Sequence, residues 1–225
     1  MNAAPEGNRG TPAYHPKGSM QIRLMEGRDI PAVVSLDRQV FTDPWPESAY
    51  VQELYFNTNA HYFVLELLDP AQARTWHTHR RRHASRLIGF VGMRVEGTHG
   101  HISTLALRPE WRGQGLGEVL LLTAVDQAIR EGARMIALEV RVSNQIALHL
   151  YGKWQFVQYS RLQRYYSDGE DAYLLHVYLD RDPAYTLRVR ERLAQLLTDL
   201  QIRLASAAAD SAESYEATTT GTGAA

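Results

Sequence analysis

The chain has 225 residues, of which 44% are hydrophobic and 22% are charged, an ordinary composition for one globular domain. Its formal net charge of −1 at pH 7 gives no overall field that would draw it onto a nucleic acid or an anionic membrane. It contains no cysteine, which excludes disulfides, thiolate nucleophiles and cysteine-based zinc sites.

Both ends of the chain differ in composition from the middle. Residues 1–19 are rich in Gly, Pro and Ala and have no apolar stretch of the kind found in a signal peptide. Residues 206–225 are of low complexity, and no segment reaches the roughly 18 apolar residues that a membrane span needs. We therefore predict disordered segments at 1–19 and 206–225 and a cytoplasmic protein without a membrane partner.

Between these ends, hydrophobic periodicity predicts alternating strands and helices. A strand at residues 21–25 precedes a helix capped by Asp29, and residues 43–48 separate this helix from a second that runs through Leu54. The other predicted strands are 61–68, 87–95, 102–107 and 134–140, followed by a hairpin of 156–166 and 172–179 with its turn at 167–171; the other helices are 116–130 and 144–153. This order predicts one α/β (α+β) domain around a mixed sheet.

A last amphipathic helix is predicted at residues 181–205. Asp182 would be its N-cap and Pro183 its first helical residue. Its apolar stripe consists of Leu193, Leu196, Leu197, Leu200 and Leu204. The stripe can pack on its own domain or pair two subunits, so a monomer and a homodimer both remain open.

The strongest chemical signal is the glycine-rich run of residues 112–117, RGQGLG, which follows a strand and opens a helix. Amides at a helix start lack intrahelical partners and, with the helix dipole, favour a phosphate group. The run does not fit the dinucleotide pattern G-x-G-x-x-G/A, and it lacks the G-K-[ST] of a P-loop. A tight turn without a ligand remains the alternative on this hexapeptide alone.

Around this loop the sequence resembles the GNAT acetyltransferases over about residues 20–180. Residues 102–117, ISTLALRPEWRGQGLG, resemble the fourth strand and pyrophosphate loop of that superfamily. Residues 138–144, 147–151 and 156–157 are similar to the following block in RimI-type ribosomal-protein alanine N-acetyltransferases. Residues 165–173, YYSDGEDAY, resemble the closing hairpin of RimI and the N-terminal acetyltransferases, and residues 41–48 resemble the first inter-helix loop. Gln155 replaces the usual glycine and Glu118 the usual arginine.

The resemblance implies the GNAT fold in residues 20–180, with a mostly antiparallel sheet that splays between its fourth and fifth strands and flanking helices. It also implies that acetyl-CoA lies in this gap as co-substrate and that no metal takes part. The implied cofactor-binding residues are Leu105, Ala106, Leu107, Arg112, Gly113, Gln114, Gly115, Leu116, Gly117, Glu118 and Asn144. Asn144 is equally well placed to be a plain helix N-cap.

Two residues of this region are implied to carry the catalysis. Glu139 stands in an apolar strand, where a carboxylate is costly unless it is paired or used, and the resemblance makes it the general base. The alternative is a salt bridge from Glu139 to Arg141 or another neighbour. Tyr151 is implied to protonate the departing sulfur of coenzyme A, and its alternative is an aromatic side chain packed on the sheet.

An N-terminal α-amine is the favoured acceptor on chemical grounds. Its pKa of about 7.7–8.0, against about 10.4 for lysine, leaves far more of it uncharged at neutral pH. Tyr165 and Tyr166 are predicted to cover a peptide groove, with Pro44 and Trp45 on the opposite rim; the alternative is a surface aromatic pair. We expect RimI-like acetylation of a protein N-terminus, possible acceptors including a ribosomal protein. The rival hypotheses are a GNAT enzyme for small amines or lysines and a non-catalytic acyl-CoA-binding module.

The polar segment at residues 69–86 is predicted to be a solvated loop. Its histidines, His77 and His79, have no carboxylate near them in sequence that would complete a metal site. Arg80, Arg81 and Arg82 give a weaker hypothesis, a contact with ribosomal RNA that salt would weaken.

Overall fold

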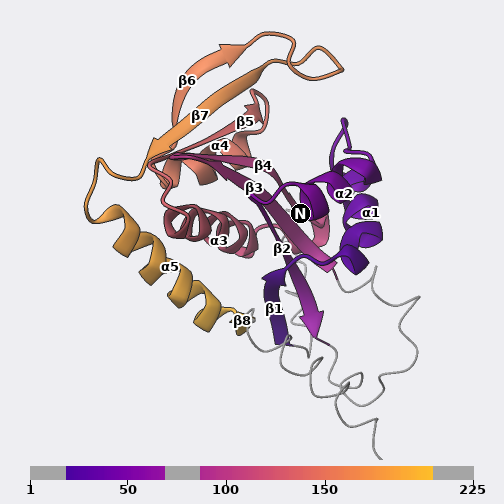
Figure 1. Ribbon diagram of the computed structural model, residues 1–225, viewed down its shortest axis with the longest axis horizontal. Coiled ribbons are helices and arrows are strands. Elements are labelled where there is room, and N and C mark those ends of the chain that lie inside the picture. Colours follow the sequence, from indigo (N-terminus) through magenta and orange to yellow (C-terminus); the bar gives the residue numbers. More distant parts are fainter. Residues whose placement is uncertain (1–18, 69–86, 205–225) are drawn as a thin grey trace, which may run out of the picture.

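The computed structural model describes residues 19–68 and 87–204, which form one eight-stranded sheet with helices on both faces (Figure 1). The strand order is β6-β7-β5-β4-β3-β2-β1-β8. The strands are β1 (Ser19–Leu24), β2 (Ala60–Leu68), β3 (Leu87–Glu96), β4 (His99–Leu107), β5 (Met135–Arg141), β6 (Val157–Leu162), β7 (Ala172–Tyr178) and β8 (Ile202–Leu204). The α-helices are α1 (Ile30–Val40), α2 (Glu47–Phe56), α3 (Leu116–Arg130), α4 (Gln145–Lys153) and α5 (Tyr185–Asp199).

The sheet opens between β4 and β5, as the resemblance implied. These strands are parallel and pair only from His99 to His101 on β4 and from Met135 to Ala137 on β5. Beyond that point β4 stays paired with β3 through Leu107, and β5 stays paired with β7 through Arg141. The second half of β4 and the second half of β5 therefore diverge, and the edges that face one another carry no ladder.

The two faces of the sheet hold two hydrophobic cores. On one face lies α3, which is buried on most of its sides because the sheet covers one side and α5 another. On the other face α1 and α2 pack around Tyr50, Tyr62 and Phe90, whose rings meet edge to face with Tyr50 in the centre. The glycine-rich loop before α3 and the splay are thus held between two independently packed layers.

Arg23 on β1 anchors the start of α1 to the sheet. Its guanidinium lies 2.6 Å and 2.9 Å from the two carboxylate oxygens of Asp29 and 3.1 Å from Glu66 on β2. Asp29 occupies the predicted N-cap position, but its side chain binds Arg23 and the amide of Glu26 in place of the helix. The capping role predicted for Asp29 is therefore wrong, because a buried cation competes for the same carboxylate.

Asp29→Asn should lower the free energy of unfolding by about 3 kcal/mol, because it leaves a buried guanidinium short of a carboxylate. Burial alone would raise the pKa of Asp29, but hydrogen bonds from Arg23 and Glu26 outweigh it and hold that pKa below 3.8. The stabilisation by ionised Asp29 is therefore complete above pH 3.8 and is lost as the pH falls through the lower pKa of the folded state. In urea titrations, the difference in free energy of unfolding between wild type and variant should become smaller on acidification. A difference independent of pH would contradict this.

The C-terminal segment differs from the prediction in two ways. The helix begins at Tyr185, and Asp182 stands before it, where its carboxylate accepts from the amide of Ala184 and pairs with Arg188 at 2.7 Å. Asp182 and Pro183 are therefore neither N-cap nor first helical residue. The helix ends at Asp199, and Leu204 belongs to β8, which pairs in parallel with β1. The remaining leucines of the stripe lie on or at the end of α5, and Leu193 and Leu196 are buried against the domain.

The closing hairpin has shorter strands than predicted. β6 ends at Leu162, so Tyr165 and Tyr166 lie in the loop of residues 163–171 that joins it to β7. The segments predicted to be disordered, 1–19 and 206–225, and the predicted loop 69–86 with Arg80, Arg81 and Arg82 lie outside the described residues, except that β1 begins at Ser19. Within the described ranges, no helix has the length and apolar character to cross a membrane.

Candidate functional site

The loop before α3 presents a row of backbone N–H groups. Gly113 and Gly115 have φ angles of 75° and 83°, in the left-handed region that favours glycine. Within residues 19–68 and 87–204, the amides of residues 113–117 donate to no carbonyl, and no side chain caps the helix. A side chain at Gly113 would meet no atom within 4 Å, so this part of the loop is open to a ligand. The arrangement suits an anion such as a diphosphate.

Glu118 does not share this property. Its amide donates to the carbonyl of Gly115 at 3.0 Å, and its carboxylate turns toward α4 and α5. There it binds Lys153 at 2.7 Å, the indole N–H of Trp154 at 3.2 Å and Arg192 at 3.3 Å. Burial raises the pKa of Glu118, but these cations outweigh it and leave it below the ordinary value. Glu118 therefore links the first turn of α3 to α4 and α5. Its amide is not among the unpaired backbone N–H groups of the loop.

The backbone of β4 leads from the splay to this loop. Leu105, Ala106 and Leu107 are paired with β3 on one edge, while their other edge faces the gap toward β5. Leu107 and Leu150 of α4 lie 3.4 Å and 3.7 Å from the place where a side chain would stand on Gly117. One wall of the gap is thus a strand with an open edge, and its far end is the glycine-rich loop.

Glu139 lies at the point where the sheet opens, and it has a partner that the sequence analysis missed. Its carboxylate oxygen is 2.8 Å from Nε2 of His101 on β4. Both side chains are partly exposed, Glu139 by 20% and His101 by 25%. Glu139 is therefore paired, but with neither Arg141 nor a neighbour in sequence. The register explains the contact, because His101 pairs with Ala137 and Glu139 follows two residues later on the same face.

The polar contacts of His101 continue along β4. Its Nδ1 lies 3.4 Å from the hydroxyl of Ser103, which in turn accepts from Arg94 of β3 at 3.3 Å. His101 stands in a run, HGHIST, in which alternate residues are polar. This alternation is the signal that could have placed His101 on the face of Glu139, had the parallel register been known.

Tyr151 and Asn144 are both on α4 or at its start. Tyr151 is 8% exposed and its ring lies 5.8 Å from that of Phe156. Burial, with a smaller contribution from the nearby hydroxyl of Tyr166, raises the pKa of Tyr151 well above its ordinary value, so it stays protonated. Asn144 accepts a hydrogen bond from the amide of Ala147 at 3.1 Å and is the N-cap that the sequence predicted.

The residues predicted to form the two rims of the acceptor groove lie on two loops that touch one another through Asp43 and Ser167. Tyr165 is 50% exposed, and its ring meets that of Tyr166 edge to face at 5.1 Å. Burial, and then the charge of Glu139, raise the pKa of Tyr165. On the facing loop the amide of Trp45 donates to Asp37 at 2.5 Å, and Pro44 is exposed beside it.

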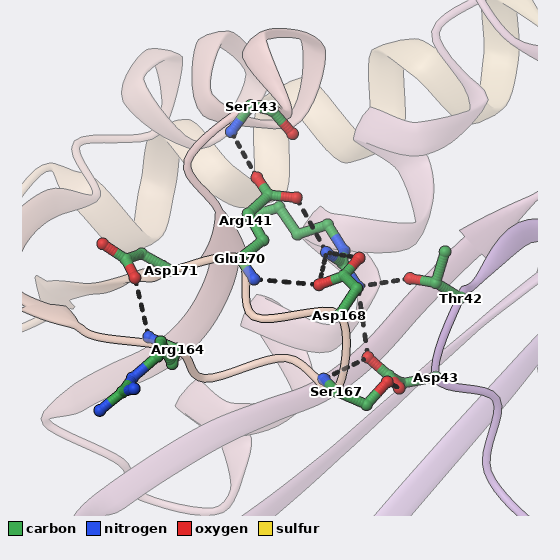
Figure 2. A network of polar contacts seen from close by, with 9 residues as sticks. All are labelled: Thr42, Asp43, Arg141, Ser143, Arg164, Ser167, Asp168, Glu170 and Asp171. Carbon is green, nitrogen blue, oxygen red and sulfur yellow. Dashed lines mark hydrogen bonds and ion pairs between the residues drawn. The ribbon is translucent and has the colours of Figure 1, made fainter.

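Polar contacts join the two loops directly, and no local sequence pattern predicted them (Figure 2). Arg141 at the end of β5 reaches both loops, and Asp43 beside Pro44 binds the amide of Ser167 at 3.1 Å. Asp43 and Ser167 are 124 residues apart in sequence. Among the described residues, no three His, Asp or Glu side chains cluster in a way that would hold a metal ion.

Known proteins are similar to this chain in sequence and in fold. The sequence pattern of the Acetyltransferase (GNAT) family matches residues 30–156. A candidate ribosomal protein bS18-alanine N-acetyltransferase of Bacillus subtilis (strain 168) is 34% identical over 162 residues, which are 72% of this chain and 97% of the relative. An N-alpha-acetyltransferase of Sulfolobus acidocaldarius is 30% identical, over 71% of this chain and 92% of the relative.

Solved structures give the same fold. The crystal structure of NAA60 from Arabidopsis thaliana in complex with acetyl-CoA matches with a TM-score of 0.60 at 19% identity, over 72% of this chain and 99% of the other. The sequence pattern covers more than half of the chain, and it includes the loop, the splay and Glu139 with His101. The chain therefore belongs to the GNAT family of acetyltransferases.

Proposed function

We propose that this acetyltransferase transfers the acetyl group of acetyl-CoA to the α-amine at a protein N-terminus. The observation that carries the proposal is the Glu139–His101 pair at the point where β4 and β5 part. The relatives named for bS18-alanine and N-alpha acetylation support this choice of acceptor. A ribosomal protein is the acceptor class that the Bacillus relative suggests.

The residues around the gap fit acetyl-CoA. The open amides of residues 113–117 suit its diphosphate, with the dipole of α3 behind them. The free edge of Leu105, Ala106 and Leu107 can pair with an extended amide-bearing chain such as pantetheine, as a neighbouring strand would. Asn144 closes the start of α4 on the opposite side of the gap.

Glu139 is the proposed general base. With the proton on Nε2, His101 donates to one carboxylate oxygen and leaves the other for the acceptor amine or a water molecule beside it. An α-amine with a pKa of about 7.7–8.0 needs only weak basic assistance at neutral pH, whereas a lysine near 10.4 needs much more. A partly solvated carboxylate paired with histidine therefore suits an α-amine better than a lysine.

Tyr151 is the proposed donor to the leaving sulfur. Because burial raises its pKa, the hydroxyl keeps its hydrogen across the neutral range and can offer it to a developing thiolate. It lies near the end of α4, with its ring 5.8 Å from that of Phe156. The proposed base and donor thus come from β5 and α4.

Acetyl-CoA turnover on short peptides tests the proposed function. The panel should contain peptides with free and with chemically blocked N-termini, including one that begins with alanine, and spermidine as a small amine. We expect turnover with the free peptides only. Equal activity on blocked peptides that carry lysine, or on spermidine alone, would replace this proposal with a lysine or small-amine acetyltransferase. Binding of coenzyme A without any turnover would indicate a binding module.

A further inference from the structure

Arg141 is the centre of the densest polar network among the described residues (Figure 2). Its Nη1 lies 2.8 Å from carboxylate oxygens of both Asp168 and Glu170 on the β6–β7 loop. Its Nη2 lies 3.3 Å from Asp43 and also binds the hydroxyl of Thr42, both on the loop between α1 and α2. One guanidinium therefore holds groups from two loops that are far apart in sequence.

The network reaches a third segment, the connection from β5 to α4. There the amide of Ser143 donates to the second oxygen of Glu170 at 2.9 Å. Asp43 also accepts from both the amide and the hydroxyl of Ser167, so the two loops touch one another as well as Arg141. Loops from three parts of the chain thus meet around the end of the strand that carries Glu139.

Arg141 also positions an aromatic side chain of the groove. Its guanidinium carbon lies 3.8 Å from the centre of the Tyr166 ring, and burial, partly opposed by Arg141, raises the pKa of Tyr166 to about 12. Arg141 follows Glu139 by two residues on β5, so both side chains leave the same face of the sheet. The ring of Tyr166 therefore stacks on a side chain that shares its face of β5 with the proposed base.

The charges of the network explain why a cation is needed at Arg141 to hold the two loops together. Three carboxylates, from Asp43, Asp168 and Glu170, gather around a single cation that is 20% exposed. The amide of Glu170 and then Arg141 lower the pKa of Asp168, while Ser143 and then Arg141 lower that of Glu170, so these two carboxylates stay charged at neutral pH. Without the cation these carboxylates repel one another across the two loops.

We propose that Arg141 is a positioning residue that latches the α1–α2 loop to the β6–β7 loop and thereby shapes the acceptor groove for an extended peptide. It acts through Tyr166 and Asp43 and does not touch the reacting atoms. This inference rests on the proposed function, because the groove it shapes is the one assigned to the protein N-terminus. Such a latch should affect the binding of the peptide residues that follow the acceptor amine, and it should not affect the binding of acetyl-CoA.

Arg141→Gln tests the latch by steady-state kinetics. We expect the KM for a peptide of about eight residues to rise at least roughly tenfold, because loss of positioning removes binding along the peptide. The KM for acetyl-CoA should stay within about twofold of the wild-type value, since the latch does not touch the loop of residues 113–117. Arg141→Lys should give an intermediate value, because lysine keeps the charge but loses the fork and the stacking on Tyr166.

Arg161→Gln is the matched control. Arg161 pairs with Asp171 at 2.6 Å, and this ion pair lies within the same hairpin and joins no second loop. This variant should leave both KM values near those of wild type. If Arg141→Gln fails to fold, Asp43→Asn decides, because it removes one anchor at the other end of the latch. In a protein that carries both changes, the rise in KM for peptide should be smaller than the product of the two single rises, because Arg141 and Asp43 share one contact.

Hydrogen exchange separates this inference from the proposed function, since it needs no acceptor. In the resting Arg141→Gln protein, amides in residues 41–48 and 163–171 should exchange faster, while residues 119–128 of α3 stay as protected as in wild type. Unchanged exchange in both loops, or a wild-type KM for peptide, would overturn the latch. An inactive wild-type protein with faster loop exchange in the variant would overturn the proposed function and leave the latch standing.

Discussion

Glu139→Gln should reduce kcat/KM for an N-terminal peptide by about 10²- to 10⁴-fold, the range typical of a lost general base. The amide is nearly isosteric with the carboxylate and keeps a hydrogen bond to His101, so the local structure should survive. The residual activity should rise with pH more steeply than that of wild type, because above about pH 8 most of the α-amine is already uncharged. Initial rates between pH 6 and 9.5 measure both effects.

His101→Gln is the companion variant for this prediction. It removes the imidazole that lies 2.8 Å from the carboxylate and leaves Glu139 in place, so the loss should be smaller than for Glu139→Gln. Because the two side chains act together, the double variant should lose much less than the product of the two single losses. Wild-type turnover by Glu139→Gln at pH 7 would remove Glu139 from the mechanism.

Tyr151→Phe should lower kcat by about 10²- to 10³-fold, the cost of removing one donor aimed at developing negative charge. The phenyl ring keeps the packing against Phe156, so the KM for acetyl-CoA should change little. Since burial raises the pKa of Tyr151, ionisation of this group should not reduce wild-type activity as the pH rises from 7 to 10. Presteady-state measurement of CoA release separates this chemical step from product dissociation.

A control for Tyr151→Phe comes from Tyr159, the exposed tyrosine of β6. Tyr159 is 68% exposed and its ring lies 4.7 Å from that of His176 on β7, so Tyr159→Phe should leave kcat unchanged. Equal losses of kcat in the two variants would show that the loss comes from lower stability or solubility, which removal of any tyrosine hydroxyl can cause. An unchanged kcat in Tyr151→Phe would mean that Tyr151 only packs in the core and is not the proton donor.

Local patterns in the chain were enough to predict most of the fold. The helix at residues 116–130 was predicted with its observed bounds, because Gly113 and Gly115 precede it and apolar residues fill most of its faces. The first residue of the final helix was predicted two positions too early, because Asp182 and Pro183 look like a helix start while Asp182 binds Arg188 and the amide of Ala184. β8 was missed because its three residues form a strand only by pairing with β1 at the opposite end of the chain.

The site shows the same division between local and long-range information. The glycine-rich loop and the cap at Asn144 depend on neighbours in sequence, and both lie where they were predicted. The pairing of His101 with Glu139 depends on the register of two parallel strands, which no local pattern specifies. Contacts such as that of Asp43 with Ser167 join segments 124 residues apart and emerge only from the folded chain.

The most direct measurement of the central claim is the position of the acetyl group in a single product. The acceptor should be a peptide with a free N-terminal alanine and one internal lysine, incubated with the full chain and acetyl-CoA and analysed by tandem mass spectrometry. The account predicts one added acetyl group, in the fragment that contains the α-amine, and none on the lysine. Acetyl on the lysine alone, or on neither amine while acetyl-CoA is bound, would contradict it.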